Sequence, residues 1–186
     1  MSILKVAKLG HPILSKVADD LPISSIKDAK VQSLIDDMVA TMREYGGVGL
    51  AAPQVHNSIK IIVIESELVG LKSSRTDLAS AFINPVLKDF STTMLKEWEG
   101  CLSLGELLGK VSRADKVTVE GFNDSGNKVK IEAEGYLARV FQHEIDHLYG
   151  KLVTHRVEDM SDLSFRAEFS RYHQNDYDAD EINEQA

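Results

Sequence analysis

Two histidines and a glutamate lie close together in the segment QHEIDHL, residues 142–148. His143 and His147 are four positions apart, so on an α-helix they project from the same face and can hold one metal ion between them. Glu144 lies beside them and can reach a water molecule at that ion. The spacing therefore predicts a metal site on a helix; the alternative is an exposed helix in which H-E-x-x-H occurs by chance.

Such a site needs a third protein ligand if one coordination position is to stay open. Glu168 is a candidate, because it follows His147 at the separation common in metalloproteases that complete the motif with a glutamate. The longer pattern H-E-x-x-H-x-x-G-x-x-H matches at Gly150 but has Val153 at its last position, which excludes that protease class. Cys101, the only cysteine, is another candidate, since a thiolate binds divalent metals well. A buried cysteine that only fills space is the alternative.

The motif helix is predicted to be enclosed by the rest of the domain. It follows Gly135, ends at Gly150, and has apolar residues on most sides. These apolar residues are Leu137, Val140, Phe141, Ile145 and Leu148. We therefore expect His143 and His147 to be buried.

Other periodic segments predict the elements that surround this helix. The first 24 residues form an extended arm, and Ser25 with Asp28 is expected to cap a helix that runs to Gly46 and Gly47. A last helix is expected from Ser161 to about His173. Strands are predicted at 60–64, 81–87 (broken by Pro85), 92–98, 116–122 and 128–133, with a strand-like segment at 151–155 and loops at 65–80, 104–112 and 123–127.

Composition limits the possible architectures and partners. A chain of 186 residues with 43% hydrophobic content fits one domain, predicted here at residues 1–174. Residues 175–186 are acidic, contain no basic residue, and are expected to be a disordered tail. The net charge of −8, without Lys/Arg clusters, argues against a DNA or anionic-membrane partner. No apolar run reaches the length of a signal peptide or a membrane span, so we expect a cytoplasmic protein.

Three segments, GVGLAAPQ (47–54), EGCLS (99–103) and QHEIDHL (142–148), together resemble the peptide deformylase family. The resemblance covers nearly the whole chain. It implies an α+β fold with antiparallel sheets packed around the motif helix, and a metal-dependent hydrolase that removes the N-formyl group from the formylmethionine of nascent polypeptides. It also implies one divalent metal ion, usually Fe(II), although Zn, Ni or Co can occupy the site, and a transient ribosome contact is a further expectation.

The resemblance assigns a role to particular residues. It implies that Glu144 is the general acid and base, and that the amide of Gln54 and the backbone N–H of Leu102 bind the formyl oxygen. The metal ligands that it implies are Cys101, His143 and His147. Glu99 and Gln142 are expected either to orient a ligand or to make ordinary structural hydrogen bonds.

The methionine side chain of such a substrate needs an apolar pocket near the metal. Tyr136 and Val140 lie on the same helical stripe as the two histidines, one to two turns before them. Val48 is the expected facing wall, while Gly47 and Gly49 leave room for the substrate backbone to pair along this segment. The alternative is that Tyr136 and Val140 belong only to the core.

The chain departs from the family beyond EGCLS. Leu104 and Gly105 stand where many members have a hydrophobic residue and proline, and Leu108 stands where a subset has an arginine. These departures put the contacts between this loop and the substrate backbone in question. Two other functions remain open from the residues: a zinc metalloprotease that uses Glu168, and a structural metal site without catalysis.

Overall fold

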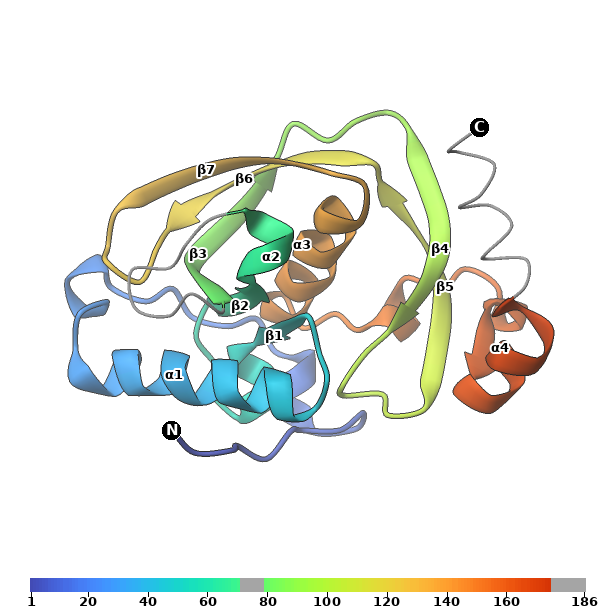
Figure 1. Ribbon diagram of the computed structural model, residues 1–186, viewed down its shortest axis with the longest axis horizontal. Helices are drawn as coiled ribbons and strands as arrows, with labels where there is room; N and C mark the ends of the chain where they lie inside the picture. The colour runs from blue at the N-terminus through green and yellow to red at the C-terminus, as the bar shows by residue number, and fades with distance from the viewer. Residues whose placement is uncertain (71–78, 175–186) are drawn as a thin grey trace.

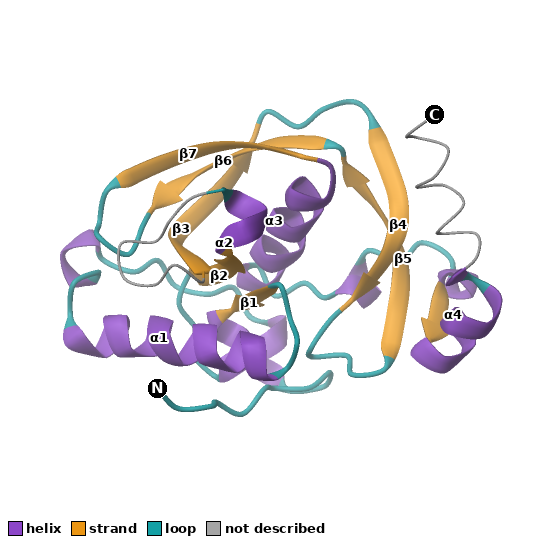
Figure 2. Ribbon diagram, in the orientation of Figure 1, coloured by secondary structure: helices purple, strands orange, loops and turns teal. Residues whose placement is uncertain are grey.

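The helix that carries QHEIDHL, α3 (Gly135–Leu148), lies between two antiparallel sheets in the computed structural model, which describes residues 1–70 and 79–174 (Figure 1). One sheet has the order β1-β2-β3-β6-β7 and the other β4-β5-β8. Helix α1 lies on the opposite side of the larger sheet from α3 (Figure 2). The predicted α+β fold around a central motif helix is confirmed.

The described elements have the following bounds. The larger sheet contains β1 (Gly49–Ala51), β2 (Ile61–Glu65), β3 (Ala79–Lys88), β6 (Lys116–Phe122) and β7 (Lys128–Glu134). The smaller sheet contains β4 (Met94–Gly100), β5 (Leu107–Ala114) and β8 (Leu163–Phe165). The remaining α-helices are α1 (Ala29–Glu44), α2 (Ser66–Val69) and α4 (Arg166–Tyr172). Short 3-10 helices are η1 (Pro12–Ser15), η2 (Ile23–Ser25), η3 (Ala52–Val55), η4 (Val153–His155) and η5 (Met160–Asp162).

The centre of the larger sheet is buried on both faces, and strand β2 shows why. Its side chains alternate, so Ile61 and Val63 join the core on the α1 side, whereas Ile62 and Ile64 join the core on the α3 side. On the α3 side, the rings of Phe82 and Phe141 meet edge to face, with centroids 4.9 Å apart. This packing fixes α3, and with it the two histidines, against a rigid sheet.

Two strand predictions need correction. Pro85 does not break the strand at 81–87, because β3 continues through a bulge in which Asn84 adopts a φ of 50°. The Asn84 Oδ1 accepts a hydrogen bond from the Leu21 N–H, and the Asn84 Nδ2 donates one to the Leu21 carbonyl. These two bonds hold the N-terminal arm at the bulge. The predicted loop 104–112 was wrong, since most of it belongs to β5, which is stabilised by pairing with β4 and β8 rather than by a local alternating pattern.

Several element boundaries also differ from the predictions. Helix α1 begins after Asp28, and Ser25 ends the separate turn η2 instead of capping the helix. The strand-like segment 151–155 contains the 3-10 turn η4, which is closed by a hydrogen bond from Leu152 N–H to the His155 ring. The last helix starts at Arg166 rather than Ser161, because residues 163–165 pair with β5 as strand β8.

Two predictions fall partly or wholly outside the described residues. The predicted polar loop 65–80 contains the short helix α2, and its residues 71–78 lie outside the described ranges. The predicted disordered tail, residues 175–186, also lies outside them. Among the described residues, no helix combines the length and apolar character needed to cross a membrane.

Candidate metal centre and substrate groove

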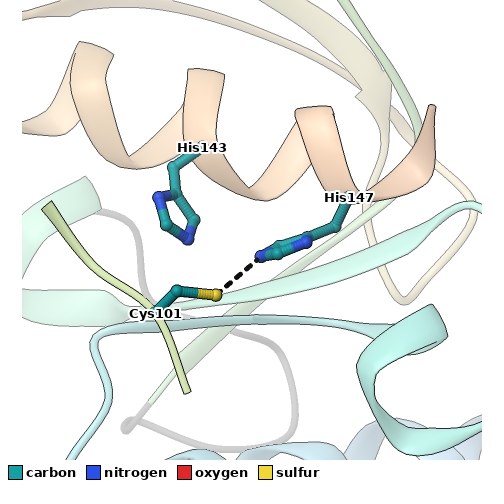
Figure 3. A group of neighbouring side chains, drawn as sticks. All are labelled: Cys101, His143 and His147. Carbon is teal, nitrogen blue, oxygen red and sulfur yellow. Dashed lines mark hydrogen bonds between the residues drawn. The ribbon is translucent and has the colours of Figure 1, made fainter. Parts of the chain in front are cut away.

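Helix α3 and the end of β4 bring three metal-binding side chains together. Ligand atoms of Cys101, His143 and His147 all lie within 4.8 Å of one another. Both histidines project from α3 toward Cys101, which follows β4 directly (Figure 3). The Cys101 Sγ is 3.4 Å from the His147 Nε2. The fold therefore assembles a thiolate and two imidazoles from segments more than forty residues apart in the sequence.

A hydrogen bond to Glu99 fixes the orientation of the His143 ring. Its Nδ1 hydrogen-bonds the Glu99 Oε2 at 2.9 Å, which leaves Nε2 to act as a metal ligand. The side chain of Glu99 is buried and comes from β4, two residues before Cys101. One strand thus supplies both a ligand and the carboxylate that orients a second ligand.

Glu99 belongs to a group of buried charged residues, Glu99, Arg113, Arg139 and Asp146, that we call the buried ion cluster. Arg113 from β5 donates two hydrogen bonds to Glu99, at 2.9 and 3.0 Å, and another to Asp146. Arg139 from α3 donates to Glu99 at 2.8 Å. Because Asp146 precedes His147, Arg113 ties the β4 ligand segment to the α3 ligand segment.

The electrostatics of the Cys101, His143 and His147 group favour a bound cation. Burial by itself would raise the pKa of the Cys101 thiol, but His147 and His143 outweigh it and lower that pKa well below its ordinary value. Burial would lower the pKa of His143, but Cys101 and Glu99 raise it well above its usual range. The negative charges of Cys101 and Glu99, which favour a proton on the imidazole, also attract a metal ion that replaces this proton.

The donor set fits one divalent metal ion. A thiolate with two imidazoles suits zinc and the neighbouring divalent transition metals, and three protein ligands are the number found in catalytic sites. Behind these ligands, His143 already has the carboxylate partner that metal-binding histidines commonly require.

Glu144 lies beside these ligands in a tight position. It is buried, and its Oε2 has no hydrogen-bond partner among the described residues. Burial raises the pKa of this carboxyl, with His143 and His147 acting in the opposite direction. A Cβ atom at Gly49 would lie 2.6 Å from the Glu144 Oε1, so only glycine leaves room for this carboxyl. An unpartnered buried carboxyl of raised pKa is suited to proton transfer.

Gln54 presents its amide nitrogen to the same site. Its Oε1 accepts a hydrogen bond from the Ala51 N–H at 2.8 Å, which fixes which end of the amide carries the NH2 group. The Nε2 lies 3.2 Å from the Ser103 Oγ and 3.8 Å from the Cys101 Sγ. An N–H donor therefore lies next to the ligand thiol.

The backbone around Leu102 is held by the turn and by the N-terminal arm. Leu104 N–H donates to the Cys101 carbonyl at 2.9 Å, and since N–H and C=O of one peptide point in opposite directions, this bond orients the Leu102 N–H. Lys8 Nζ donates to the Leu102 carbonyl at 2.7 Å. The arm also binds the Gln54 carbonyl through the Ala7 N–H. One arm thus contacts both segments that carry candidate donors.

A groove of about 650 Å³ runs past these residues. Its walls come from the segment before and within β1, from the end of β4, and from α3. It contains every residue predicted for the substrate pocket, namely Gly47, Val48, Gly49, Tyr136 and Val140. Gly105 also lines the groove, whereas Leu108 is buried beneath it and packs against Gly100.

Some sequence-derived candidates do not belong to this site. Glu168 is exposed on α4, forms an ion pair with Arg171, and is not part of the metal-binding group, so the alternative of a site completed by Glu168 is wrong. Gln142 bonds the backbone of Ala114 and Ala138 and therefore ties α3 to β5 instead of orienting a ligand.

The sequence analysis missed Arg113, Arg139 and Asp146. Arg113 lay at the edge of a segment predicted as a loop, and no local pattern marks it as buried. Asp146 lies within QHEIDHL, so its position between the ligands on a buried helix was the one available indication that it needs a cationic partner.

Comparisons with known proteins agree on one family. A family model described as "Polypeptide deformylase" matches residues 3–162. The chain is 46% identical to a peptide deformylase of Halothermothrix orenii over 157 residues, which cover 84% of this chain and 95% of that protein. It is 42% identical to one from Carboxydothermus hydrogenoformans, with 86% and 97% covered.

Solved structures give the same result. The crystal structure of peptide deformylase from Thermotoga maritima matches with a TM-score of 0.75 and 35% identity, covering 86% of this chain and 100% of that one. The actinonin-bound class I type b peptide deformylase from Acinetobacter baumannii matches with a TM-score of 0.76 and 37% identity, covering 85% and 100%.

Proposed function

The chain belongs to the peptide deformylase family, whose members remove the N-formyl group from nascent polypeptides, and we propose how its own residues carry out this hydrolysis. The observation that carries the proposal is the unpartnered, buried carboxyl of Glu144 beside the Cys101, His143 and His147 cluster. A zinc protease built on Glu168 is not supported, because Glu168 does not reach this cluster.

We assign Cys101, His143 and His147 as the ligands of one divalent metal ion, and propose Fe(II) as the physiological ion. When bound, the ion supplies a Lewis acid that polarises the formyl carbonyl and lowers the pKa of the attacking water. The thiolate adds negative charge to the site and suits soft or borderline ions such as Fe(II), Ni, Co and Zn. Glu99, supported by Arg113, holds the His143 ring in the orientation that exposes Nε2.

Glu144 moves the proton. It takes a proton from the attacking water as oxygen adds to the formyl carbon, and it delivers that proton to the amine nitrogen as the carbon–nitrogen bond breaks and formate leaves. Its raised pKa brings the carboxyl closer to the pH at which both transfers must occur. The missing side chain at Gly49 gives the carboxyl space to do so.

Gln54 and Leu102 stabilise the negative charge that develops on the formyl oxygen. The Gln54 Nε2 carries the donor hydrogens because its Oε1 is already bonded to Ala51 N–H. The Leu102 N–H is oriented by the bond from Leu104 N–H to the Cys101 carbonyl. Donors fixed in advance stabilise an oxyanion without reorganisation, and each contributes about 10²–10³-fold to the rate.

The methionine side chain occupies the groove between Val48, Tyr136 and Val140. Val140 is buried in α3 one turn before His143, whereas Tyr136 and Val48 are partly exposed at the groove wall. Gly47 and Gly49 let the substrate backbone pass close to β1. Val140→Phe fills this space, so the preference for formyl-Met over formyl-Ala peptides should fall while metal content stays unchanged.

Formate release from formyl-Met-Ala under anaerobic conditions tests the function directly, with acetyl-Met-Ala as the control substrate. Glu144→Gln should lower turnover by about 10²–10⁴-fold with metal retained, because the amide cannot transfer the proton. If Glu144→Gln kept full activity, the result would indicate that the metal site is structural and not catalytic. Metal analysis of Cys101→Ala and Glu168→Ala tests the ligand set, and loss of metal only from the second variant would overturn it.

The identity of the ion, the cellular compartment and the partner are further parts of the proposal. Activity of the Fe(II) form should decay in air faster than that of the nickel form, because oxidation of iron exposes the Cys101 thiolate to oxidation. Equal decay would argue against iron as the vulnerable component. We also propose that the protein works in the cytoplasm with transient ribosome contact, which cosedimentation with translating ribosomes at low salt would test.

A further inference from the structure

Arg166, the first residue of α4, reaches the substrate groove from outside the three segments described above as its walls. Its side chain lines the groove, and its Nη2 lies 3.5 Å from the position that a Cβ atom would take at Gly100. Gly100 immediately precedes the ligand Cys101. The guanidinium therefore lies over the backbone next to the metal centre.

Main-chain pairing sets the position of Arg166. Strand β8 pairs with β5 in the register Leu107 to Phe165, and the Arg166 N–H donates to the Glu106 carbonyl at 2.8 Å. Strand β8 ends at Phe165, which is exposed and does not line the groove, and the next residue, Arg166, does line it. Helix α4 lies beside the smaller sheet (Figure 1). There the ring of Phe169 packs edge to face on the ring of Trp98 from β4, with centroids 5.3 Å apart.

Arg166 differs from the other cations that line the groove. Arg139 is buried and bonded to Glu97 and Glu99, and Lys8 donates to the Leu102 carbonyl. Arg166 is half exposed, and its ionic partner Glu106 is itself exposed, with a closest approach of 3.8 Å. An exposed pair at that distance is weak, so the Arg166 donors can turn to another acceptor.

Two observations describe where the cation over Gly100 comes from. Leu108, from the β5 segment beneath, packs its Cδ2 3.3 Å from the Cβ position of Gly100, so that segment offers no donor there. Arg166 comes from residues beyond 162, where the match to the family model ends. The cation over Gly100 is thus supplied by a segment outside the matched part of the chain.

We propose that Arg166 binds a main-chain carbonyl oxygen of the substrate beyond the formylmethionine, an inference that rests on the proposed function. The formyl group reacts next to Cys101, so the following residues of an extended peptide run along the groove away from the metal. A planar guanidinium at the groove wall is suited to bind a main-chain carbonyl oxygen there, whatever the side chain of that substrate residue. Arg166 therefore favours longer substrates over short ones.

Kinetics on three C-terminal amides, formyl-Met, formyl-Met-Ala and formyl-Met-Ala-Ser, test the proposal. The amides remove the terminal carboxylate, which nascent chains lack near the site. Arg166→Met should raise KM for the tripeptide about 10-fold, the usual effect of losing one hydrogen bond from a charged donor, and leave kcat unchanged. KM for formyl-Met amide should change less than about twofold, since that substrate is too short to gain from the contact.

Arg171→Met is the matched control, because Arg171 lies on the same helix, is exposed, and does not line the groove. It should leave all three KM values unchanged. Arg166→Lys keeps the charge but not the planar group, and should give an intermediate KM for the tripeptide. Calorimetry with Met-Ala-Ser amide should show a matching loss of affinity in Arg166→Met, independently of turnover.

The inference is overturned if Arg166→Met leaves the tripeptide KM unchanged, if it raises KM equally for all three substrates, or if Arg171→Met has the same effect. Failure of the proposed function would look different, because the unmodified protein would then release no formate from any of the three substrates.

Discussion

The two sides of the Cys101, His143 and His147 group are built in contrasting ways. Behind the ligands, the buried ion cluster packs two arginines against two carboxylates. On the groove side, the hydrogen-bonding side chains of Gln54 and Ser103 are neutral, and hydrogen bonds to the main chain hold both residues in place. The one carboxyl placed there for chemistry, that of Glu144, has no hydrogen-bond partner among the described residues and has space because Gly49 lacks a side chain.

This difference separates two tasks. Buried charges that are mutually paired resist rearrangement, because removing one partner leaves another charge without compensation in a medium of low dielectric constant. They therefore suit the ligand side, where geometry must persist through every turnover. Neutral donors and glycines suit the groove side, because a substrate must enter, displace water and leave.

The largest expected effect tests the ligand side. Arg113→Met leaves Glu99 and Asp146 with fewer partners, and should lower the free energy of unfolding by about 3 kcal/mol. Urea denaturation of the metal-loaded and metal-depleted proteins measures this change, and the variant should also lose metal more readily to a chelator. Arg171→Met, an exposed arginine of α4, is the control. An unchanged unfolding midpoint would mean that the buried ion cluster does not hold the ligand segments together.

The second prediction concerns the groove side. Gln54→Leu removes the side-chain donor while keeping the volume, and should lower kcat by about 10²–10³-fold with full metal content. Gln142→Leu is the matched control, since Gln142 is also buried but bonds only backbone atoms away from the groove. If both variants lose activity equally, the loss comes from buried amides in general and not from an oxyanion donor.

A smaller effect is expected at Gly49. Gly49→Ala brings a methyl group to 2.6 Å from the Glu144 Oε1, so the carboxyl must shift. Displacement of a reacting group by about 1 Å can cost up to about 10²-fold in rate, and we expect a fall of that order in kcat with little change in unfolding free energy. A crystal structure of the variant with an unmoved Glu144 and normal kcat would contradict the expected crowding.

The smallest effect is expected at the N-terminal arm. Lys8→Met removes the donor to the Leu102 carbonyl but keeps the apolar stem, and should lower kcat about threefold, the effect of a modest change in one hydrogen bond. Lys5→Met changes the net charge equally at an exposed position of the same arm and serves as the control. If the two variants behave alike, Lys8 acts through charge rather than through Leu102.

The sequence by itself determined the family, the α+β class and the group of metal-binding residues. His143 and His147 could be paired because helical spacing is a local property, and the three segments GVGLAAPQ, EGCLS and QHEIDHL are specific in combination. The hairpin of β6 and β7 was also predicted correctly, since alternation and a turn sequence both lie within it.

Only the tertiary structure decided the rest, because those features depend on partners far away in the chain. Strand β5 has no clear alternation of its own and forms through pairing with β4 and β8. Arg113 is buried because Glu99 and Asp146 converge on it from two other elements, and Arg166 reaches the groove because β8 pairs with β5. These features depend on contacts between segments far apart in the chain: one is a buried charge, and the other is a groove residue supplied from near the C-terminus. The local spacing of residues does not indicate such contacts.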